Sequence, residues 1–124
     1  MNFQPELAEK VMAGEKTVTR RLVSHNPRSP WFVDRCSLKV NHSYAVCPGR
    51  GKHAIGRVVV TSVELVPLDP IDADEAHLEG FESVAAFWDA FNAINPNVDA
   101  GEYVWRIAFQ RVADEDLVLW EPAS

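Results

Sequence analysis

The chain has 124 residues and a mass of 13.9 kDa, which is enough for one domain. Its 12 lysine and arginine residues stand against 18 aspartate and glutamate residues, and the net charge of −6 argues against a protein that is basic overall and coats nucleic acid. The hydrophobic fraction of 47% is typical of a globular domain, and no apolar run approaches the roughly 18–20 residues of a membrane span.

The N-terminal part of the chain predicts a helix, a strand and a loop. Residues 5–13 predict a short helix, since Pro5 suits its first turn and Gly14 suits its C-cap. The segment 17–23 is rich in β-branched residues and predicts a strand. Residues 24–37 contain prolines and aromatic side chains, and they predict an ordered loop with at most one helical turn.

Two further strands are predicted over residues 43–47 and 53–66. Gly56 would allow a bend or bulge in the longer strand. The turn between the strands carries Arg50 and Lys52, so two basic side chains lie at its tip.

Two helices follow, over residues 73–79 and 84–94. Asp72 and Ser83 precede them and suit their N-cap positions. The second helix carries an apolar stripe at helical spacing, which is typical of a helix packed on a core. The stripe consists of Val84, Phe87, Trp88 and Phe91.

Residues 103–109 predict the last clear strand, because apolar side chains alternate along it. The strands and helices do not alternate regularly, which favours an antiparallel α+β domain. We expect a small curled sheet or β-barrel with flanking helices. A single domain is expected over residues 1–124, in which about 113–124 form an acidic C-terminal tail and 117–120 could add a short strand.

Charge is distributed unevenly along the chain. Residues 1–60 hold ten basic and four acidic side chains, a net charge of +6, whereas residues 61–124 hold two and fourteen, a net charge of −12. The basic side chains are densest from Lys16 to Arg57, where they can hold an anion locally. The alternative is that the basic and acidic halves pair with each other across the fold.

The two cysteines, Cys36 and Cys47, match neither a redox pair nor a zinc-ribbon spacing. We expect free thiols in a reducing, cytoplasmic compartment, since the N-terminal residues lack the basic and apolar regions of a signal peptide. Nearby histidines at positions 25, 42 and 53 have no helix-face or zinc-knuckle spacing, so we expect no metal and no cofactor.

The densest polar cluster runs from Gly14 to Arg21, and the strand period places Thr19 and Arg21 on one face. A threonine hydroxyl acts as a nucleophile only with a base beside it. Lys16 can be that base if desolvation or a neighbouring cation lowers its pKa, and Arg20 and Arg21 would supply the second effect. The alternative is a solvated polar strand face next to a helix cap.

Residues 14–21, with the pattern GxKxxTxR, resemble the GxKxxExR signature of the ASCH domain family, which belongs to the PUA-like superfamily of small β-barrels. Residues 79–81 and the helix after them resemble the family's Glu-Gly-Phe element, and residues 103–109 resemble its closing strand. The resemblance spans roughly residues 3–110. It implies a PUA-like barrel with a cleft for RNA or a nucleoside.

Thr19 stands where the broad family has glutamate, and in this the chain resembles the bacterial N4-acetylcytidine amidohydrolases. Those enzymes hydrolyse the acetyl amide of the nucleoside, a linear amide, with a Thr-Lys-Glu set. The resemblance implies Thr19 as nucleophile, Lys16 as base, and Glu79 as the partner of Lys16 or a proton shuttle. Arg21 or a backbone N–H could stabilise the oxyanion.

We expect the cleft to bind RNA or a modified nucleoside or nucleotide, with no membrane partner and as a monomer or weak dimer. Three aromatic side chains could stack on a base: Trp31, Tyr44 and Phe81. Five basic side chains could contact phosphate or the ligand: Arg20, Arg21, Arg50, Lys52 and Arg57. Two alternatives to the hydrolase stay open, a non-catalytic RNA-binding or regulatory module and a ribonuclease that uses the same cleft.

Overall fold

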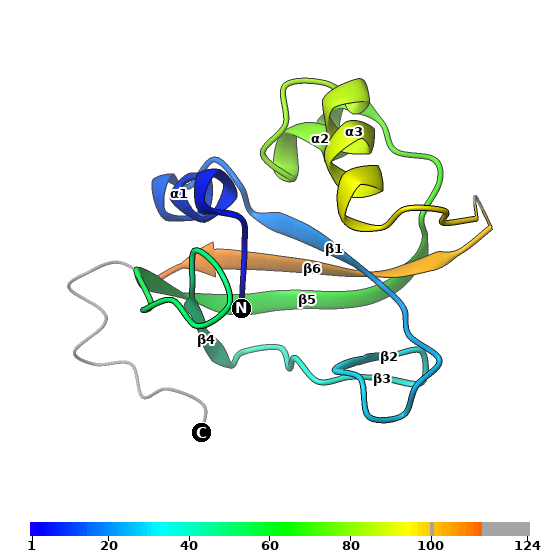
Figure 1. Cartoon of the computed structure of the whole chain (residues 1–124). Coiled ribbons are helices and arrows are strands. Elements are labelled where there is room, and N and C mark those ends of the chain that lie inside the picture. Colours follow the sequence, from blue (N-terminus) through cyan, green and yellow to red (C-terminus); the bar gives the residue numbers. More distant parts are fainter. Residues whose placement is uncertain (100, 113–124) are drawn as a thin grey trace.

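Within residues 1–99 and 101–112, which the computed structural model describes, the protein forms a four-stranded antiparallel sheet with three helices and a small hairpin (Figure 1). The order of the strands in the sheet is β1 (Val18–Leu22), β6 (Tyr103–Arg111), β5 (Gly56–Pro67) and β4 (Ser43–Val46). The helices are α1 (Pro5–Ala13), α2 (Ala73–Leu78) and α3 (Val84–Ile94). Strands β1 and β4 are therefore the two edges of the sheet.

The α+β class and the mostly antiparallel sheet with flanking helices are confirmed, but the sheet is open. In the described part of the chain β1 does not pair with β4, so the strands do not close into a barrel. The chain between these two edges forms a separate hairpin, β2 (Trp31–Phe32) with β3 (Arg35–Cys36), instead of a strand that bridges them. This hairpin also replaces the loop with at most one helical turn that the sequence predicted.

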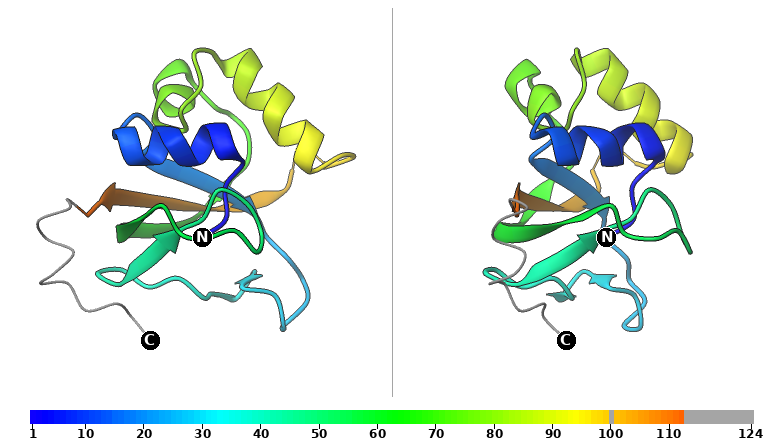
Figure 2. Two further views of the ribbon diagram at one scale, coloured as in Figure 1. Left: turned by 60° about the vertical axis from the view of Figure 1, so that its left-hand side comes forward. Right: turned by 90° about the vertical axis from the view of Figure 1, so that its left-hand side faces the viewer.

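The helices cover opposite faces of β6. Ile107 packs in a core cluster with Val11 of α1, whereas Val104, which points to the other face of the strand, packs in a second cluster with Phe87 of α3. All three helices lie toward the β1 edge of the sheet (Figures 1 and 2). The β1 edge is therefore the place where the two helical layers meet.

Local sequence explains where the helices begin and end. Gly14 ends α1 with a φ of 79°, a left-handed conformation that glycine adopts without steric cost. Asp72 and Ser83 cap α2 and α3 as predicted, because each side chain accepts a hydrogen bond from a backbone N–H three residues further on.

The irregularity of β5 lies between Val60 and Ser62 and not at the predicted Gly56. Gly56 instead lets Met12 of α1 pack closely against the backbone of β5, because a Cβ at this position would collide with the Met12 side chain.

The predicted tail at 113–124, with its short strand at 117–120, lies outside the described residues. Cys36 and Cys47 are free thiols, as predicted. Over residues 1–99 and 101–112, no helix is long and apolar enough to cross a membrane, and no three His, Cys, Asp or Glu side chains are grouped as metal ligands.

Candidate functional site

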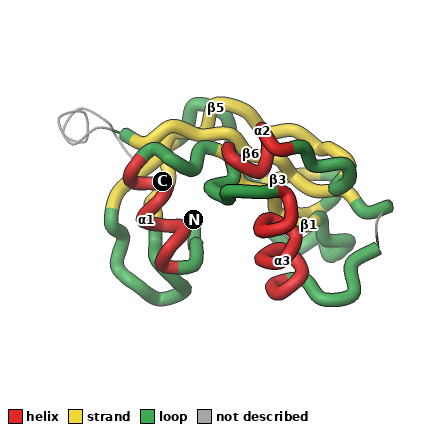
Figure 3. Tube along the Cα trace, turned by 90° about the horizontal axis from the view of Figure 1, so that it is seen from above, coloured by secondary structure: helices red, strands yellow, loops and turns green. Residues whose placement is uncertain are grey.

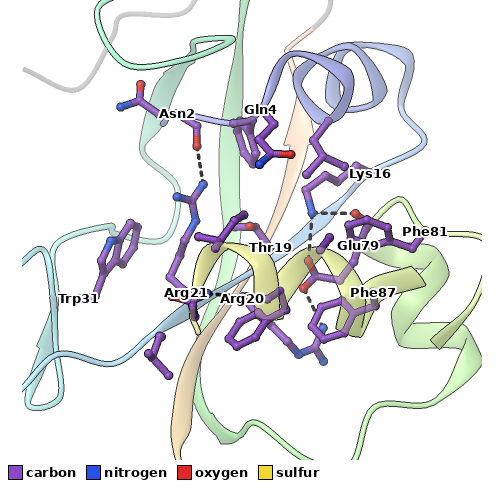
Figure 4. A pocket seen from close by; sticks show the side chains of 17 residues that line it. Asn2, Gln4, Lys16, Thr19, Arg20, Arg21, Trp31, Glu79, Phe81 and Phe87 are labelled. Carbon is purple, nitrogen blue, oxygen red and sulfur yellow. Dashed lines mark hydrogen bonds and ion pairs between the residues drawn. The ribbon is translucent and has the colours of Figure 1, made fainter. Parts of the chain in front are cut away.

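A cavity of about 280 Å³ lies along the free edge of β1 (Figure 4). It is lined by Thr19 and Arg21 from one face of the strand and by Arg20 and Leu22 from the other. The helices α1 and α3, which stand apart when seen from above (Figure 3), and the N-terminal residues 2–4 supply further lining side chains. The cavity thus wraps around the edge of the sheet, between its two helical layers.

Main-chain groups of β1 point toward this cavity. Thr17 accepts a backbone hydrogen bond from β6 at 2.9 Å and Val23 donates one to it at 3.2 Å, so the odd-numbered residues of β1 bond to β6. The N–H and C=O groups of the even-numbered residues consequently point away from β6, toward the free edge. These residues are Val18, Arg20 and Leu22, of which Arg20 and Leu22 line the cavity.

Lys16 lies at the buried end of the cavity, with 2% of its surface exposed. Its Nζ donates to Val18 O at 2.8 Å, to Glu79 O at 2.7 Å and to Glu79 Oε1 at 3.0 Å. These bonds use all three protons of the ammonium group. Burial lowers the pKa of Lys16, the Glu79 carboxylate opposes this shift, and the charges of Arg21 and Arg20 add to it.

Glu79 joins Lys16 to a second set of charges. Its other carboxylate oxygen, Oε2, accepts from Arg20 Nη1 at 2.9 Å, and Arg20 Nη2 donates to Glu75 Oε1 at 2.6 Å. Arg106, opposite Arg20 in the sheet, donates to the same Glu75 oxygen at 2.7 Å, and this hydrogen bonding lowers the pKa of Glu75. Both oxygens of Glu79 are thus held by buried cations, which fixes the position of Lys16.

Thr19 lines the same cavity and is 5% exposed. Its hydroxyl makes no hydrogen bond with any residue that the structure describes, and the Lys16 ammonium is directed to other acceptors. The hydroxyl is therefore available to a ligand. Lys16, the candidate base, lines the same cavity as Thr19, but its Nζ is not hydrogen-bonded to the Thr19 hydroxyl.

Arg21 lies at the other end of the cavity with Asn2 and Trp31 (Figure 4). This end is the more open one, because none of these three residues is buried. Its Nη2 donates to Asn2 O at 2.8 Å. The guanidinium carbon lies 5.2 Å from the centre of the Phe3 ring and 5.4 Å from that of the Trp31 ring. The guanidinium is thus held by two aromatic contacts and one hydrogen bond.

Aromatic side chains form much of the apolar wall of the cavity. Phe87 and Phe91 are stacked, with ring centres 5.7 Å apart and an interplanar angle of 21°, and Phe81 meets the edge of Phe87 at 5.9 Å. The predicted stacking residues Trp31 and Phe81 both belong to this wall. A planar ligand can therefore find aromatic surface at both ends of the cavity.

Four predicted binding residues do not line this cavity: Tyr44, Arg50, Lys52 and Arg57. They belong to β4, to the start of β5 and to the turn between these strands, at the sheet edge opposite β1. The Tyr44 hydroxyl accepts a backbone hydrogen bond at 2.8 Å, and Arg57 donates to Ser43. Arg50 and Lys52 are exposed. These four residues belong to the basic half of the sequence, as Lys16 does, but the fold places them at the other edge of the sheet.

Several residues of the site were not predicted. Asn2, Gln4 and Asn95 line the cavity, and Phe87 and Phe91, predicted for the core, also line it. These residues come from the N-terminal segment and from α3 with its C-cap, so no local pattern connects them. The Glu75–Arg106 pair was also missed, since it depends on how α2 packs against β6.

The structure decides between the two interpretations of the uneven charge, and each is partly right. Lys16 and Arg20, from the basic half, pair with Glu79 and Glu75, from the acidic half. The basic residues within 21–57 form no ion pair with the described part of the chain. The positive charges of residues 21–57 are therefore not neutralised by ion pairs with the described residues.

The variant Gly80→Ala is expected to lower the free energy of unfolding by about 1–2 kcal/mol and to displace Lys16. Gly80 has a φ of 91°, and a Cβ there would lie 3.2 Å from Lys16 Cβ. Gly14→Ala is the matched control, because Gly14 has a φ of 79° but no atom within 4 Å of an added Cβ. Urea unfolding should show a larger loss of unfolding free energy for Gly80→Ala than for Gly14→Ala. Equal losses would contradict a close contact between an added Cβ and Lys16.

Comparison with known proteins identifies the family. A family model described as an ASCH domain matches residues 1–94. The fold is similar to that of the ASCH domain of Lactobacillus crispatus JV V101, with a TM-score of 0.70 and 17% identity over 86% of this chain and 70% of that one. No curated protein matches the chain.

Two other solved structures are also similar. A protein of Enterococcus faecalis V583 has a TM-score of 0.60 and 19% identity, over 86% of this chain and 70% of that one. A mutant of ZmASCH from Zymomonas mobilis has a TM-score of 0.53 and 14% identity, over 100% of this chain and 84% of that one. Because the family model covers most of the chain, including Lys16, Thr19 and Glu79, and solved ASCH domains share its fold, the chain belongs to the ASCH domain family.

Proposed function

We propose that the protein binds one unpaired nucleoside unit, either free or within RNA, in the cavity at the β1 edge. ASCH domains are linked to RNA binding, and this cavity has the features that an unpaired base requires. The observation that carries the proposal is that aromatic side chains and two residues whose N–H and C=O groups point outward from β1, Arg20 and Leu22, line one cavity. A base stacks through its faces and forms hydrogen bonds through its edge.

The size of the cavity supports a single nucleoside unit. Its volume of about 280 Å³ lies near the lower end of the roughly 300–1,000 Å³ that small-molecule sites span. A base that is paired in a duplex already uses its polar edge, so it could not bond to the main chain of Arg20. We therefore expect single-stranded RNA and free nucleosides to bind in preference to duplex RNA.

Calorimetric titration with cytidine and with a short single-stranded RNA tests this proposal. Phe81→Leu is expected to weaken binding about tenfold, because one aromatic stack contributes roughly 1–3 kcal/mol. Tyr103→Leu is the matched control, since Tyr103 is 47% exposed and does not line the cavity. Absence of binding for both ligands would overturn the proposal. An unchanged affinity in Phe81→Leu would show that Phe81 does not stack on the base.

Hydrolysis of N4-acetylcytidine is a second candidate function. The observation that favours it is the unbonded Thr19 hydroxyl in the same cavity as the Lys16–Glu79 pair. A threonine nucleophile, a lysine of lowered pKa and a carboxylate form a coherent set for cleavage of an amide.

The reaction would proceed in two steps once Lys16 has given a proton to Glu79 or to solvent. Thr19 Oγ1 forms a bond to the acetyl carbon while its proton passes to the Lys16 amine. The bond from the acetyl carbon to the exocyclic nitrogen then breaks, and the nitrogen takes that proton and leaves as the amine of cytidine. Water then attacks the acetyl ester on Thr19 while one of its protons passes to the Lys16 amine. The bond from the acetyl carbon to Thr19 Oγ1 breaks, Oγ1 takes the proton from Lys16, and acetic acid leaves and loses its remaining proton to solvent.

A further inference from the structure

We infer that the open end of the cavity, at Arg21, accepts a phosphate group attached to the ribose of the bound nucleoside. This inference rests on the proposed nucleoside binding and makes it more specific. It separates a nucleotide, or a nucleotide unit of RNA, from an uncharged nucleoside as the preferred ligand.

The charge of Arg21 has no counter-ion in the described residues. Three cations and one carboxylate line the cavity, and the two oxygens of that carboxylate, Glu79, are bonded to Lys16 and Arg20. Glu75, the next carboxylate of the cluster, is shared between Arg20 and Arg106. Arg21 is thus the lining cation whose charge is left for an anionic ligand.

Most of the hydrogen-bond donors of Arg21 are also unused. A guanidinium has five N–H donors. Within the described chain, Arg21 donates one hydrogen bond, from Nη2 to Asn2 O at 2.8 Å. Nη2 keeps a second proton, which forms a planar fork with Nε or with Nη1, and such a fork binds two oxygens of a phosphate at once.

The guanidinium is held in place before a ligand arrives. The rings of Phe3 and Trp31 lie 5.2 and 5.4 Å from its carbon, and the bond to Asn2 fixes its rotation. A group held in this way loses little conformational entropy when it binds a ligand. The contacts thus favour a defined anion site over a loosely attracted surface charge.

The arrangement of the cavity matches the polarity of a nucleotide. Lys16 and Glu79, 2% and 3% exposed, lie at one end, and Arg21 lies with Trp31 and Asn2 at the other, more open end (Figure 4). A base at the closed end would leave its ribose pointing to the open end. A phosphate on that ribose would then meet the Arg21 fork.

Calorimetric titration of the full chain with cytidine, cytidine 5′-monophosphate and cytidine 3′-monophosphate tests the inference. One of the monophosphates is expected to bind about tenfold more tightly than cytidine, because charge-assisted hydrogen bonds to phosphate are among the strong ones. This advantage should shrink as salt increases. A dinucleotide with an internal phosphodiester distinguishes RNA from a free nucleotide as the source of the phosphate.

Substitutions show whether Arg21 causes the tighter binding of the monophosphate. In Arg21→Met the ratio of the monophosphate affinity to the cytidine affinity is expected to fall to about one, whereas Arg57→Met, outside the cavity, should keep the wild-type ratio. If Arg21→Met does not fold, Arg21→Lys keeps the charge without the fork and should reduce the ratio in part.

The outcomes separate this inference from the proposed function. If cytidine binds and neither monophosphate nor the dinucleotide binds more tightly, or if the ratio survives in the Arg21 variant, the phosphate site is overturned while nucleoside binding stands. If none of the ligands binds, both are overturned. Tight binding of the monophosphate alone, lost in the Arg21 variant, supports the phosphate site and contradicts base recognition.

Discussion

Replacing Glu79 with glutamine is expected to lower the free energy of unfolding by about 3–5 kcal/mol, the usual cost of leaving a buried charge without its partner. The side chains of Lys16 and Glu79 are 2% and 4% exposed and 3.0 Å apart, and Arg20, 4% exposed, binds the second oxygen at 2.9 Å. Glutamine has nearly the same shape, but its NH₂ group would point a donor at one of two buried cations.

A surface ion pair in the same protein provides the control. Glu64 lies 3.8 Å from Arg106 and its side chain is 57% exposed. Glu64→Gln is therefore expected to cost less than about 1 kcal/mol, because water screens exposed pairs. Urea unfolding measures both variants, and similar small losses would contradict the buried cluster.

A double-mutant cycle isolates the pair itself. Lys16→Met removes the cation that Glu79→Gln leaves unpaired, so it should cost much less in the Glu79→Gln background than in the wild type. A coupling free energy above about 1 kcal/mol is expected for two residues in direct contact. Independent, additive losses would show that Lys16 and Glu79 do not stabilise each other.

Thr19 is the nucleophile of the hydrolase candidate. If the wild type converts N4-acetylcytidine to cytidine, Thr19→Val should lower kcat at least about a thousandfold, because it removes the nucleophile and keeps the shape of the side chain. Thr17→Val is the matched control, two residues earlier on the same face of the chain and outside the lining of the cavity. Chromatographic detection of released cytidine measures both variants.

The pH dependence of the same reaction reports on Lys16. A lysine accepts a proton only in its neutral form, so kcat should rise with pH through the pKa of Lys16, which burial holds below that of an exposed lysine. A rate that does not rise with pH would contradict a lysine base. No turnover by the wild type would remove the hydrolase candidate and leave the binding proposal untouched.

Local sequence patterns predicted the regular elements well because these depend on neighbouring residues. Asp72 and Ser83 marked the starts of α2 and α3, and Gly14 marked the end of α1. The hairpin of β2 and β3 was not predicted, because each strand has two residues and is too short to show an alternating pattern.

Closure of the sheet could not be predicted from the strands alone. It depends on whether the two edge strands, β1 and β4, pair with each other, and the hairpin between them in sequence does not bridge them. The same topology explains why Tyr44 and Arg57 lie away from the cavity, since β6 and β5 separate their edge from β1.

The site itself was predicted in part. The resemblance brought Lys16, Thr19 and Glu79 together, and all three line one cavity. The contacts of Arg20 with Glu75 and Glu79 could not be foreseen. The two glutamates follow Arg20 by 55 and 59 positions in the sequence, and they meet it only when α2 packs next to β1. Sequence spacing alone does not specify such pairs.

The most direct test of nucleoside binding at the β1 edge is a titration of the ¹⁵N-labelled protein with cytidine, followed by NMR amide shifts. We expect the largest changes over residues 19–22 and at Trp31 and Phe81, because these line the cavity. Changes confined to the exposed turn at 48–55, with none along β1, would contradict it.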